Sequence, residues 1–353
     1  MRQVGVDSLK ISDVLAKTIY SSKGRVLLGK GVRLTPLYIG KLRDMGISIV
    51  YVEDERFNDV VIDDVISEEH RREAMQIIEV STQAVRLGRD FDGFQLKTFV
   101  SKVVEEILFQ KDILVSMMDM RSRDNYVFSH SVNVCVLAIV LGKAMLLDRE
   151  KLESLAIGAL LHDIGKIHFD ETFLQNTESF TSADVELMKT HTTLGFEDLR
   201  KKKELNLAIA HIAFQHHEAA DGSGYPRGLK EGEIHPLAQI VCLVDLYDRL
   251  ISDHSGILRV MPHIACEILM GHATRSFPLE LVRTFLKNVA VYPTGVMVKL
   301  NNCEIGVVVD QNLSMPSRPV VRVLEEELGV GKGKAKEYNM VNTRTLFIDE
   351  VMQ

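Results

Sequence analysis

Histidines and carboxylates gather in one part of this sequence at positions that suit metal binding. The side chains that could act together are His130, His162, Asp163, His191, His216, His217 and Asp245. Imidazole and carboxylate ligands without thiolate suit Fe, Mn, Zn or Ni, and five histidines with two aspartates exceed what one tetrahedral ion needs. The set therefore predicts two divalent metal ions, which together can activate a bridging water and hold a phosphoryl group.

Each of these residues also has an interpretation without a metal. A single histidine on an apolar helix is usually a hydrogen-bonded core residue, and Asp245 can pair with Arg249 four positions later. However, Asp163 and Asp245 stand within the strongly apolar runs AIGALLHDIG and IVCLVDLYD. A carboxylate there is costly to desolvate unless it is paired or bound to a cation. Taken together, the pattern favours metal-dependent phosphoester hydrolysis.

Helices must position these side chains, because apolar residues recur at helical spacing through this part of the chain. The expected helices cover about residues 128–146, 149–163, 183–202, 205–217, 236–252, 259–271 and 278–288. Between two of them, residues 221–228 form a turn-rich loop whose glycines permit positive φ. The candidate ligands lie on or beside separate helices, so their convergence depends on how the helices pack.

The sequence predicts four parts, of which only the third carries the candidate metal ligands. These are a small β-rich module at 1–60, a helical connector at 61–115, a helical phosphohydrolase domain at 116–290 and a small β-rich module at 291–353. The expected strands are Val4–Leu9, Lys17–Tyr20, Arg25–Leu28, Ile47–Val52, Val296–Leu300, Ile305–Val309 and Val320–Leu324. The connector either packs against the next domain or pairs with a second copy, which leaves a homodimer as an open expectation.

Composition excludes several classes of protein. The chain has 353 residues, of which 46% are hydrophobic and 26% charged, so it can bury a sizeable core. A net charge of −7 argues against binding to long nucleic acid, which depends on the release of phosphate counterions. No apolar run is long enough to span a membrane. The four cysteines are widely spaced and lack a C-x-x-C pair, which suits a reducing, cytoplasmic location.

Five segments resemble the HD-GYP family, a subgroup of the HD phosphohydrolases. They are HSVNVCVLA from His130, LLHDIGKI from Leu160, MKTHTTLG from Met188, FQHHEAADGSGYPRGL from Phe214 and LVDLYDRL from Leu243. HD-x-G-K followed about fifty residues later by HHE-x-x-DG-x-GYP is a highly specific combination, and the match extends over about residues 120–285. The resemblance implies a mainly α protein with an all-helical HD-type catalytic domain. The β-rich flanks resemble the accessory modules that accompany such domains.

The resemblance also implies an activity and roles for individual residues. Such domains hydrolyse cyclic di-GMP to linear pGpG, and often onward to GMP, by means of a metal-bridging hydroxide. The seven residues above match metal ligands, and Asp163 matches the carboxylate that bridges two ions. The expected metal is iron, with manganese as the alternative. The residues that match substrate-binding positions are Lys166, Asp221, Gly224, Tyr225 and Arg227.

Two of these matches have alternative interpretations. Lys166 matches a catalytic lysine that neutralises charge on the phosphorane and protonates the leaving oxygen. As a residue near a helix end, it can instead complement the helix dipole. Tyr225 either stacks on or hydrogen-bonds to the nucleotide, or it anchors its own loop.

Three departures from the family pattern bear on the function. Tyr126 stands where some members have a glutamate that binds a third metal, which favours a dinuclear site. His254 stands where an Arg-Pro-Tyr segment often supplies a guanidinium to a ligand phosphate, and imidazole lacks that fork. The usual proline and lysine after HD-x-G-K are replaced near Phe169-Asp170 and Gln175-Asn176. Two alternatives therefore stay open: a nucleotide-binding signalling module with little turnover, and a phosphohydrolase for another cyclic dinucleotide or a nucleotide.

Overall fold

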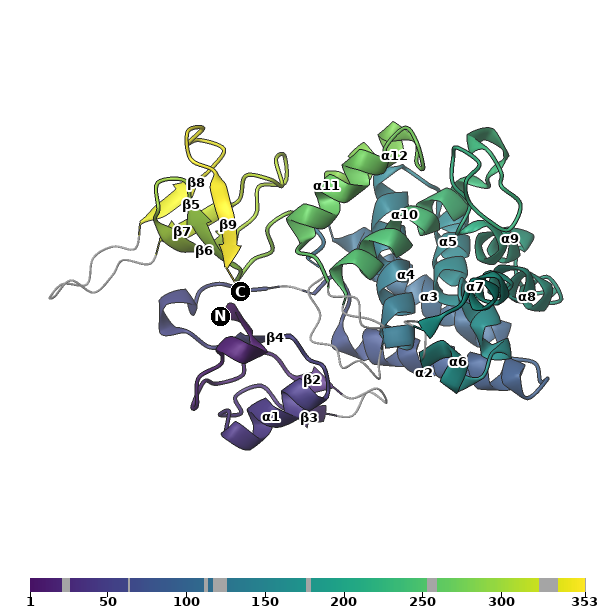
Figure 1. Cartoon of the computed structure of the whole chain (residues 1–353), viewed down its shortest axis with the longest axis horizontal. Helices are drawn as coiled ribbons and strands as arrows, with labels where there is room; N and C mark the ends of the chain where they lie inside the picture. Colours follow the sequence, from purple (N-terminus) through teal and green to yellow (C-terminus); the bar gives the residue numbers. More distant parts are fainter. Residues whose placement is uncertain are drawn as a thin grey trace, which may run out of the picture. The chain divides into compact units, whose positions relative to one another are not determined.

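The chain folds into two compact units (Figure 1). The computed structural model describes residues 1–20, 26–62, 64–110, 114–116, 126–175, 179–252, 259–323 and 336–352. The first unit comprises Met1–Asp64, Leu114–Asn125 and Leu286–Gln353, and the second comprises Val65–Ile113 and Tyr126–Phe285. The expected mainly α fold with β-rich modules at both ends is confirmed. The division into four parts stays a prediction.

The first unit contains the strands, which pair in three antiparallel sheets. They are β1 (Arg2–Gly5), β2 (Ile19–Tyr20), β3 (Val26–Leu28), β4 (Ile49–Val52), β5 (Met297–Leu300), β6 (Ile305–Asp310), β7 (Val320–Val323), β8 (Glu337–Asn339) and β9 (Ile348–Met352). β1 pairs with β4, β2 pairs with β3, and the C-terminal strands form one sheet in the order β8-β7-β6-β5-β9. Helix α1 (Pro36–Asp44) precedes β4 and is capped by the Thr35 side chain.

The strands of the structure differ from the predicted strands in three places. The strand expected at Val4–Leu9 ends at Gly5, because Val6–Ser8 turn into a short 3-10 helix. β8 and β9 were not predicted. β8 has only three residues, and β9, with the sequence IDEVM, lies at the edge of its sheet with no alternation of buried and exposed positions. Without that period-two pattern, a sequence carries little sign of a strand.

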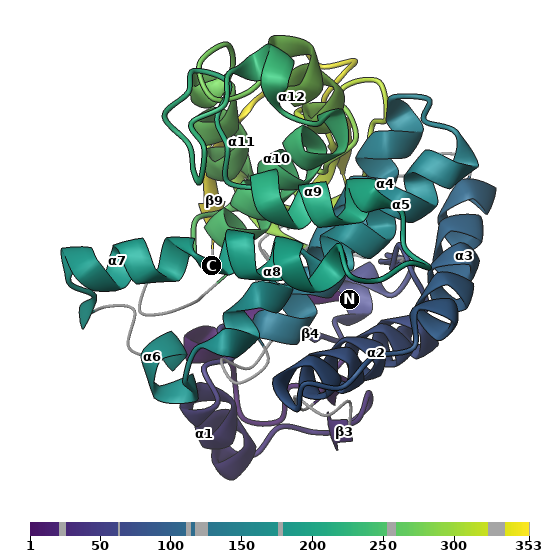
Figure 2. The ribbon, with the colours of Figure 1, turned by 90° about the vertical axis from the view of Figure 1, so that its right-hand side faces the viewer.

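The second unit is built from helices (Figure 2). A 3-10 segment also lies at a position that matters for the site. The helices are α2 (Glu68–Arg86), α3 (Gly93–Phe109), α4 (Tyr126–Ala144), α5 (Arg149–Leu161), α6 (Glu171–Gln175), α7 (Ser182–Lys189), α8 (His191–Leu199), α9 (Leu207–Gln215), α10 (Pro236–Ile251), α11 (Pro262–His272) and α12 (Leu279–Leu286). The 3-10 segment η4 (Ile164–His168) follows α5. α4 packs against α5 and α10, and α8 lies beside α9 and η4.

Apolar helices form the centre of this unit and carry polar side chains into it. α4 is buried continuously from Ser129 to Gly142 along its described side chains, and α5 is buried continuously from Ser154 to Leu161. A helix that is apolar on all sides belongs in a core. Asp148 caps the start of α5, and Pro236 stands at the first position of α10. These helices therefore bring the few polar residues within them into a dry environment.

One helix expected at residues 183–202 is in fact two. α7 ends at Lys189 and α8 begins at His191, with Thr190 between them. Thr190 keeps helical dihedral angles, so the chain bends without a glycine or proline to mark the position. The sequence pattern therefore could not locate the break. The break makes His191 the first residue of α8.

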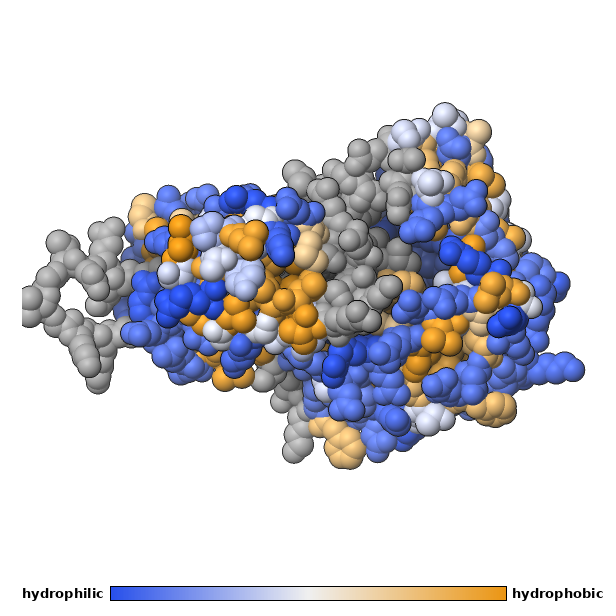
Figure 3. Space-filling model, turned by 90° about the horizontal axis from the view of Figure 1, so that it is seen from below, coloured by the Kyte–Doolittle hydropathy of each residue, from blue (hydrophilic) through white to orange (hydrophobic). Residues whose placement is uncertain are grey.

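No helix in the described part of the chain combines the length and hydropathy needed to cross a bilayer. On the face in Figure 3, hydrophilic residues cover much of the helical unit and hydrophobic residues lie among them in smaller groups. Exposed apolar side chains, such as Phe94 and Phe109, are usual on the surface of globular proteins. Nothing in this surface tests the expected homodimer, which stays a prediction.

Candidate metal centre

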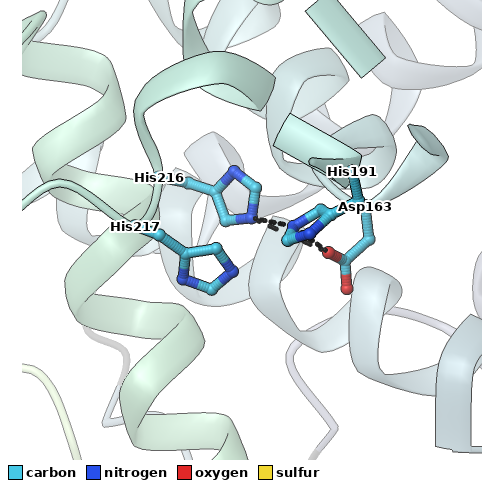
Figure 4. Close-up of side chains that lie close together, drawn as sticks. All are labelled: Asp163, His191, His216 and His217. Carbon is cyan, nitrogen blue, oxygen red and sulfur yellow. Dashed lines mark hydrogen bonds and ion pairs between the residues drawn. The ribbon is translucent and has the colours of Figure 1, made fainter. Parts of the chain in front are cut away.

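The seven candidate ligands converge in two groups. The first group is Asp163, His191, His216 and His217, and the second is His130, His162 and Asp245. In each group every residue offers one ligand atom that lies within 4.8 Å of the others. Figure 4 shows the first group, which joins the turn after α5, the start of α8 and the turn after α9. Residues distant in sequence thus meet as a metal centre requires.

Backbone hydrogen bonds orient three of the histidines. The Nδ1 atoms of His162, His191 and His216 donate to the carbonyl oxygens of Ala159, Met188 and Ala213 at 2.7, 2.6 and 2.9 Å. A ring that donates through Nδ1 presents the lone pair of Nε2, the usual arrangement for a metal-binding histidine. Burial lowers the pKa of His191 to about 3 and also lowers the pKa of His216. Both rings are therefore neutral and available as ligands.

Two of these ring nitrogens face each other across the first group. His191 Nε2 lies 3.4 Å from His216 Nε2. Figure 4 shows the two rings beside each other. Because both rings use Nδ1 as the donor, two lone pairs point toward the same space. A cation between the two nitrogens would turn this repulsion into attraction.

Asp163 lies between the two groups and offers one oxygen to each. Its Oδ2 is 3.3 Å from His162 Nε2, and its Oδ1 is 3.4 Å from His191 Nε2 and 3.7 Å from His216 Nε2. Burial disfavours ionisation, but the charge of Lys166 and the interactions with His162 and His216 hold the pKa of Asp163 well below its usual range. An ionised carboxylate in this position can bridge two cations.

Two buried polar atoms of the site lack hydrogen bonds, which a bound metal would explain and a metal-free core would not. Among the described residues, His162 Nε2 and Asp163 Oδ1 are buried and make no hydrogen bond. Leaving such atoms unsatisfied costs about 1–3 kcal/mol each, and native proteins rarely tolerate it. Imidazole nitrogen and carboxylate oxygen together are ligands for divalent first-row metals. The clustered residues are therefore candidate metal ligands, as the sequence predicted.

The second group is held by an additional carboxylate that sequence reasoning missed. His130 Nε2 lies 3.0 Å from Asp245 Oδ1, and His130 Nδ1 lies 2.7 Å from Asp248 Oδ2. Burial lowers the pKa of His130, but the hydrogen bonds to Asp245 and Asp248 outweigh it and raise the pKa to about 9. The signal for Asp248 was its spacing, because residues three apart share a helix face. Arg249 Nε lies 3.3 Å from Asp245 Oδ2, so the expected pairing of these two residues also occurs.

Lys166 and Tyr225 lie beside the clustered ligands. Lys166 Nζ is 2.6 Å from Asp163 Oδ2, and about a third of its side chain is exposed. The Tyr225 ring stacks on His217, with 4.7 Å between centroids and 28° between planes. Lys189 Nζ lies 5.5 Å from the centroid of the Tyr225 ring. Both predicted substrate-binding residues therefore border the metal centre.

The other predicted substrate-binding residues belong to the loop that carries Tyr225. A Cβ atom on Gly224 would lie 2.3 Å from the backbone nitrogen of Ala219, so only glycine fits there. Asp221 accepts hydrogen bonds from Ser223 and contacts Arg275, and the side chains of Asp221 and Arg227 are exposed. These contacts hold the loop and leave a role in substrate binding as a prediction.

Sequence reasoning also missed the residue that fixes this loop. Glu218 is almost fully buried, and its two carboxylate oxygens accept from the backbone nitrogens of Arg227 and Leu229 at 2.8 and 2.9 Å. Its position directly after His217 in the HHE segment was the available signal. His254 and Asn176 lie outside the described residues.

Comparison with known proteins supports this assignment of the helical unit. Residues 127–250 match the HD domain family, and residues 297–353 match the KOW domain associated with HD domain. A cyclic di-GMP phosphodiesterase of Pseudomonas aeruginosa is 29% identical over 244 residues, which are 67% of this chain and 57% of that protein. A 3'3'-cGAMP-specific phosphodiesterase of Vibrio cholerae is 31% identical over 150 residues, which are 42% of this chain and 33% of that protein.

The fold has a counterpart among solved structures. An HDG"Y"P protein from Bdellovibrio bacteriovorus matches with a TM-score of 0.50 and 21% identity, covering 80% of this chain and 97% of that chain. The matched part of this chain spans 57% of the length of the Pseudomonas aeruginosa protein and 33% of the length of the Vibrio cholerae protein. The motifs, the two matched families and the shared architecture agree with one another. Residues 127–250 therefore match an HD domain, and the fold of the chain is similar to that of an HDG"Y"P protein.

Proposed function

We propose that this chain is a metal-dependent phosphodiesterase that hydrolyses cyclic di-GMP to pGpG, and in a second step to GMP. The observation that carries the proposal is the position of Asp163, with one oxygen toward each group of histidines. Similarity to a protein named as a cyclic di-GMP phosphodiesterase supports the choice of substrate. The location of the protein in the cytoplasm stays a prediction.

The clustered residues divide between two proposed metal sites. His191, His216 and His217 would hold one cation, His130, His162 and Asp245 the other, and Asp163 would contact both. When bound, two divalent cations, expected to be iron with manganese as the alternative, supply activated water and neutralise phosphate charge. The backbone carbonyls of Ala159, Met188 and Ala213 keep the histidine rings in the ligating tautomer.

Residues outside the ligand set would act on the substrate. Hydrolysis adds water across one P–O bond, so negative charge builds on the phosphoryl oxygens and on the leaving oxygen. Lys166, beside Asp163 and partly exposed, is placed to neutralise that charge and to donate a proton from Nζ to the leaving oxygen. Tyr225 presents an aromatic ring fixed against His217, suited to contact with a guanine base.

A turnover assay on protein prepared anaerobically with iron or manganese tests the proposal. Incubation with cyclic di-GMP should yield pGpG, identified by chromatography and mass spectrometry, and a chelator should abolish the reaction. Asp163→Asn should lose at least about 100-fold in kcat, because it removes the negative charge between the two sites. Asp349→Asn, an exposed aspartate of β9 in the other unit, is the matched control and should retain wild-type turnover. Equal turnover in Asp163→Asn and wild type would refute the mechanism.

A second candidate substrate follows from the likeness to a 3'3'-cGAMP-specific enzyme. Both cyclic dinucleotides present the same phosphodiester bonds, so the metal centre cannot distinguish them. Specificity would come from residues that contact the bases, such as those of the loop that carries Tyr225. Comparison of kcat/KM for cyclic di-GMP, 3'3'-cGAMP and cyclic di-AMP decides between these substrates. Nucleotide binding with negligible product from all three would instead favour a signalling module without turnover.

A further inference from the structure

A chain of hydrogen bonds runs from helix α2 to the second group of candidate ligands. α2 packs against α4 and η4, and Arg71 near its start reaches into that contact. Arg71 Nη1 donates to Asn133 Oδ1 at 2.8 Å, and Asn133 Nδ2 donates to Asp248 Oδ1 at 2.8 Å. Asp248 Oδ2 then lies 2.7 Å from His130 Nδ1. Arg71 lies outside residues 127–250, the segment that matches the HD domain.

The chemistry of these side chains determines which atom donates and which accepts in each of these hydrogen bonds. A guanidinium can only donate, so it determines which side of the Asn133 amide is the acceptor. The amide nitrogen must then face Asp248, and the Asp248 carboxylate can only accept. His130 therefore keeps its Nδ1 proton and presents Nε2 to Asp245, at 3.0 Å from Oδ1. Each side chain thus orients the next one, and the last of them, His130, is a proposed metal ligand.

The two middle members are fully buried. Asn133 and Asp248 have no exposed surface, whereas Arg71 is partly buried. A buried amide or carboxylate is costly unless its partners are in place, so such networks form as a unit. Loss of Arg71 would leave the buried oxygen of Asn133 without this donor. The Asn133 amide, which donates to Asp248, would then be held less firmly.

We propose that Arg71 is a positioning residue for the metal centre, acting through Asn133 and Asp248 on the ring of His130. This inference rests on the proposed function, because it assumes that His130 binds a metal. The position of α2 thereby influences affinity for the ion held by His130, His162 and Asp245. The hydrogen bonds that start at Arg71 do not include His191, His216 or His217. Arg71 is thus expected to affect one of the two ions.

Metal titration of Arg71→Met, Arg71→Lys and Arg72→Met tests the proposal. Manganese binding to metal-free protein is followed by calorimetry, which gives the number of sites and the affinity of each. Arg71→Met keeps the apolar stem but removes the donors, and should weaken one site by about 10- to 100-fold and leave the other unchanged. Arg71→Lys should recover part of that loss. Arg72→Met, the same kind of change at an exposed neighbour on α2, should bind as wild type.

The outcomes separate this inference from the proposed function. Two wild-type-like sites in Arg71→Met would overturn the inference and leave the proposed function standing. Absence of manganese and iron binding by wild type would overturn both. Equal weakening of both sites, with lower thermal stability, would mean that Arg71 only supports the fold, which also overturns the inference. If Arg71→Met does not fold, the same titration of Arg71→Lys decides. The ammonium should not fully replace the Nη1 donor, so wild-type affinity at both sites in Arg71→Lys would overturn the inference.

Discussion

Lys166 and Asp163 bring opposite charges to the border of the candidate metal centre. Their side chains are 2.6 Å apart, but Asp163 is nearly buried whereas Lys166 is partly exposed. The lysine can therefore meet a substrate phosphate without leaving the carboxylate. The alternative role expected from the sequence, that of a helix-end lysine, does not by itself require the contact with Asp163.

Lys166→Met should reduce kcat by about 100- to 1000-fold, the usual cost of removing one donor that stabilises transition-state charge. Metal content should stay at the wild-type level, because lysine is not among the candidate ligands. Lys203→Met, a matched change at an exposed lysine before α9, should keep full turnover. Steady-state kinetics with metal analysis of the same samples gives both quantities. Loss of metal from Lys166→Met would show that the lysine acts through the fold and not on the substrate.

Among the elements, η4 depends on a glycine that the HD-x-G-K motif supplies. A Cβ atom on Gly165 would lie 2.0 Å from the carbonyl oxygen of His191 and 2.6 Å from the backbone nitrogen of Gly195. η4 thus contacts the backbone of α8 directly. The close approach places Asp163, just before η4, near His191 at the start of α8.

Gly165→Ala should lower the free energy of unfolding by about 1–3 kcal/mol or more, because the backbone must separate to admit the methyl group. Gly271→Ala is the control, since Gly271 stands in α11 with no atom within 4 Å of an added Cβ. There, alanine should be neutral or stabilising by about 0.5–1 kcal/mol. Denaturant unfolding of the metal-free variants measures both changes. Equal stability of the two variants would contradict the proposed contact of η4 with α8.

In the other unit, an ion pair between β7 and the turn that contains Asp59 predicts that stability depends on pH. Arg322 of β7 bonds to both oxygens of Asp59, at 2.7 and 2.6 Å, and these bonds lower the pKa of Asp59 to about 2. A carboxyl with a depressed pKa stabilises the fold above its unfolded pKa of about 4, and this contribution is lost as pH falls toward 2.

Asp59→Asn should therefore lower the melting temperature by a small amount at about pH 5, because Asp59 is largely exposed and its pair is screened by solvent. The difference from wild type should become smaller as pH falls to about 2, where roughly half of the wild-type carboxyl is protonated. Thermal unfolding of both proteins at the two pH values measures this difference in melting temperature. A difference that persists unchanged at about pH 2 would contradict the role of the ion pair.

Some helices and strands could be predicted from the sequence and others could not. Long helices such as α4 and α10 were predicted within about two residues, because α4 is a long apolar run and Pro236 marks the start of α10. The division between α7 and α8 was missed because Thr190 stays helical, and β9 was missed because its residues do not alternate. Asp248 and Glu218 were missed because their roles depend on partners distant in sequence.

For the whole molecule, the candidate ligands come from separate helices and turns of one unit. Their residue types and motifs were readable from the sequence, but the division into two groups about Asp163 required the packing of α4, α5, α8, α9 and α10. A ligand that binds only the folded state stabilises it, by about 2.7 kcal/mol when its concentration is 100-fold above Kd. Bound metal should therefore increase the stability of the unit that these helices form.

Removal of metal by a chelator should lower the melting temperature of the helical unit, and addition of manganese or iron should restore it. Asp163→Asn should show a much smaller difference between the two conditions, because it weakens both sites. Asp349→Asn should respond as wild type. Differential scanning calorimetry with and without chelator provides the comparison. A chelator effect equally large in Asp163→Asn would place the stabilising metal elsewhere.

Anomalous diffraction from crystals of the manganese-loaded protein tests the central claim most directly. It should reveal two separate peaks, one among His191, His216 and His217 and one among His130, His162 and Asp245, with the Asp163 carboxylate between them. A single peak, or peaks away from Asp163, would contradict the account.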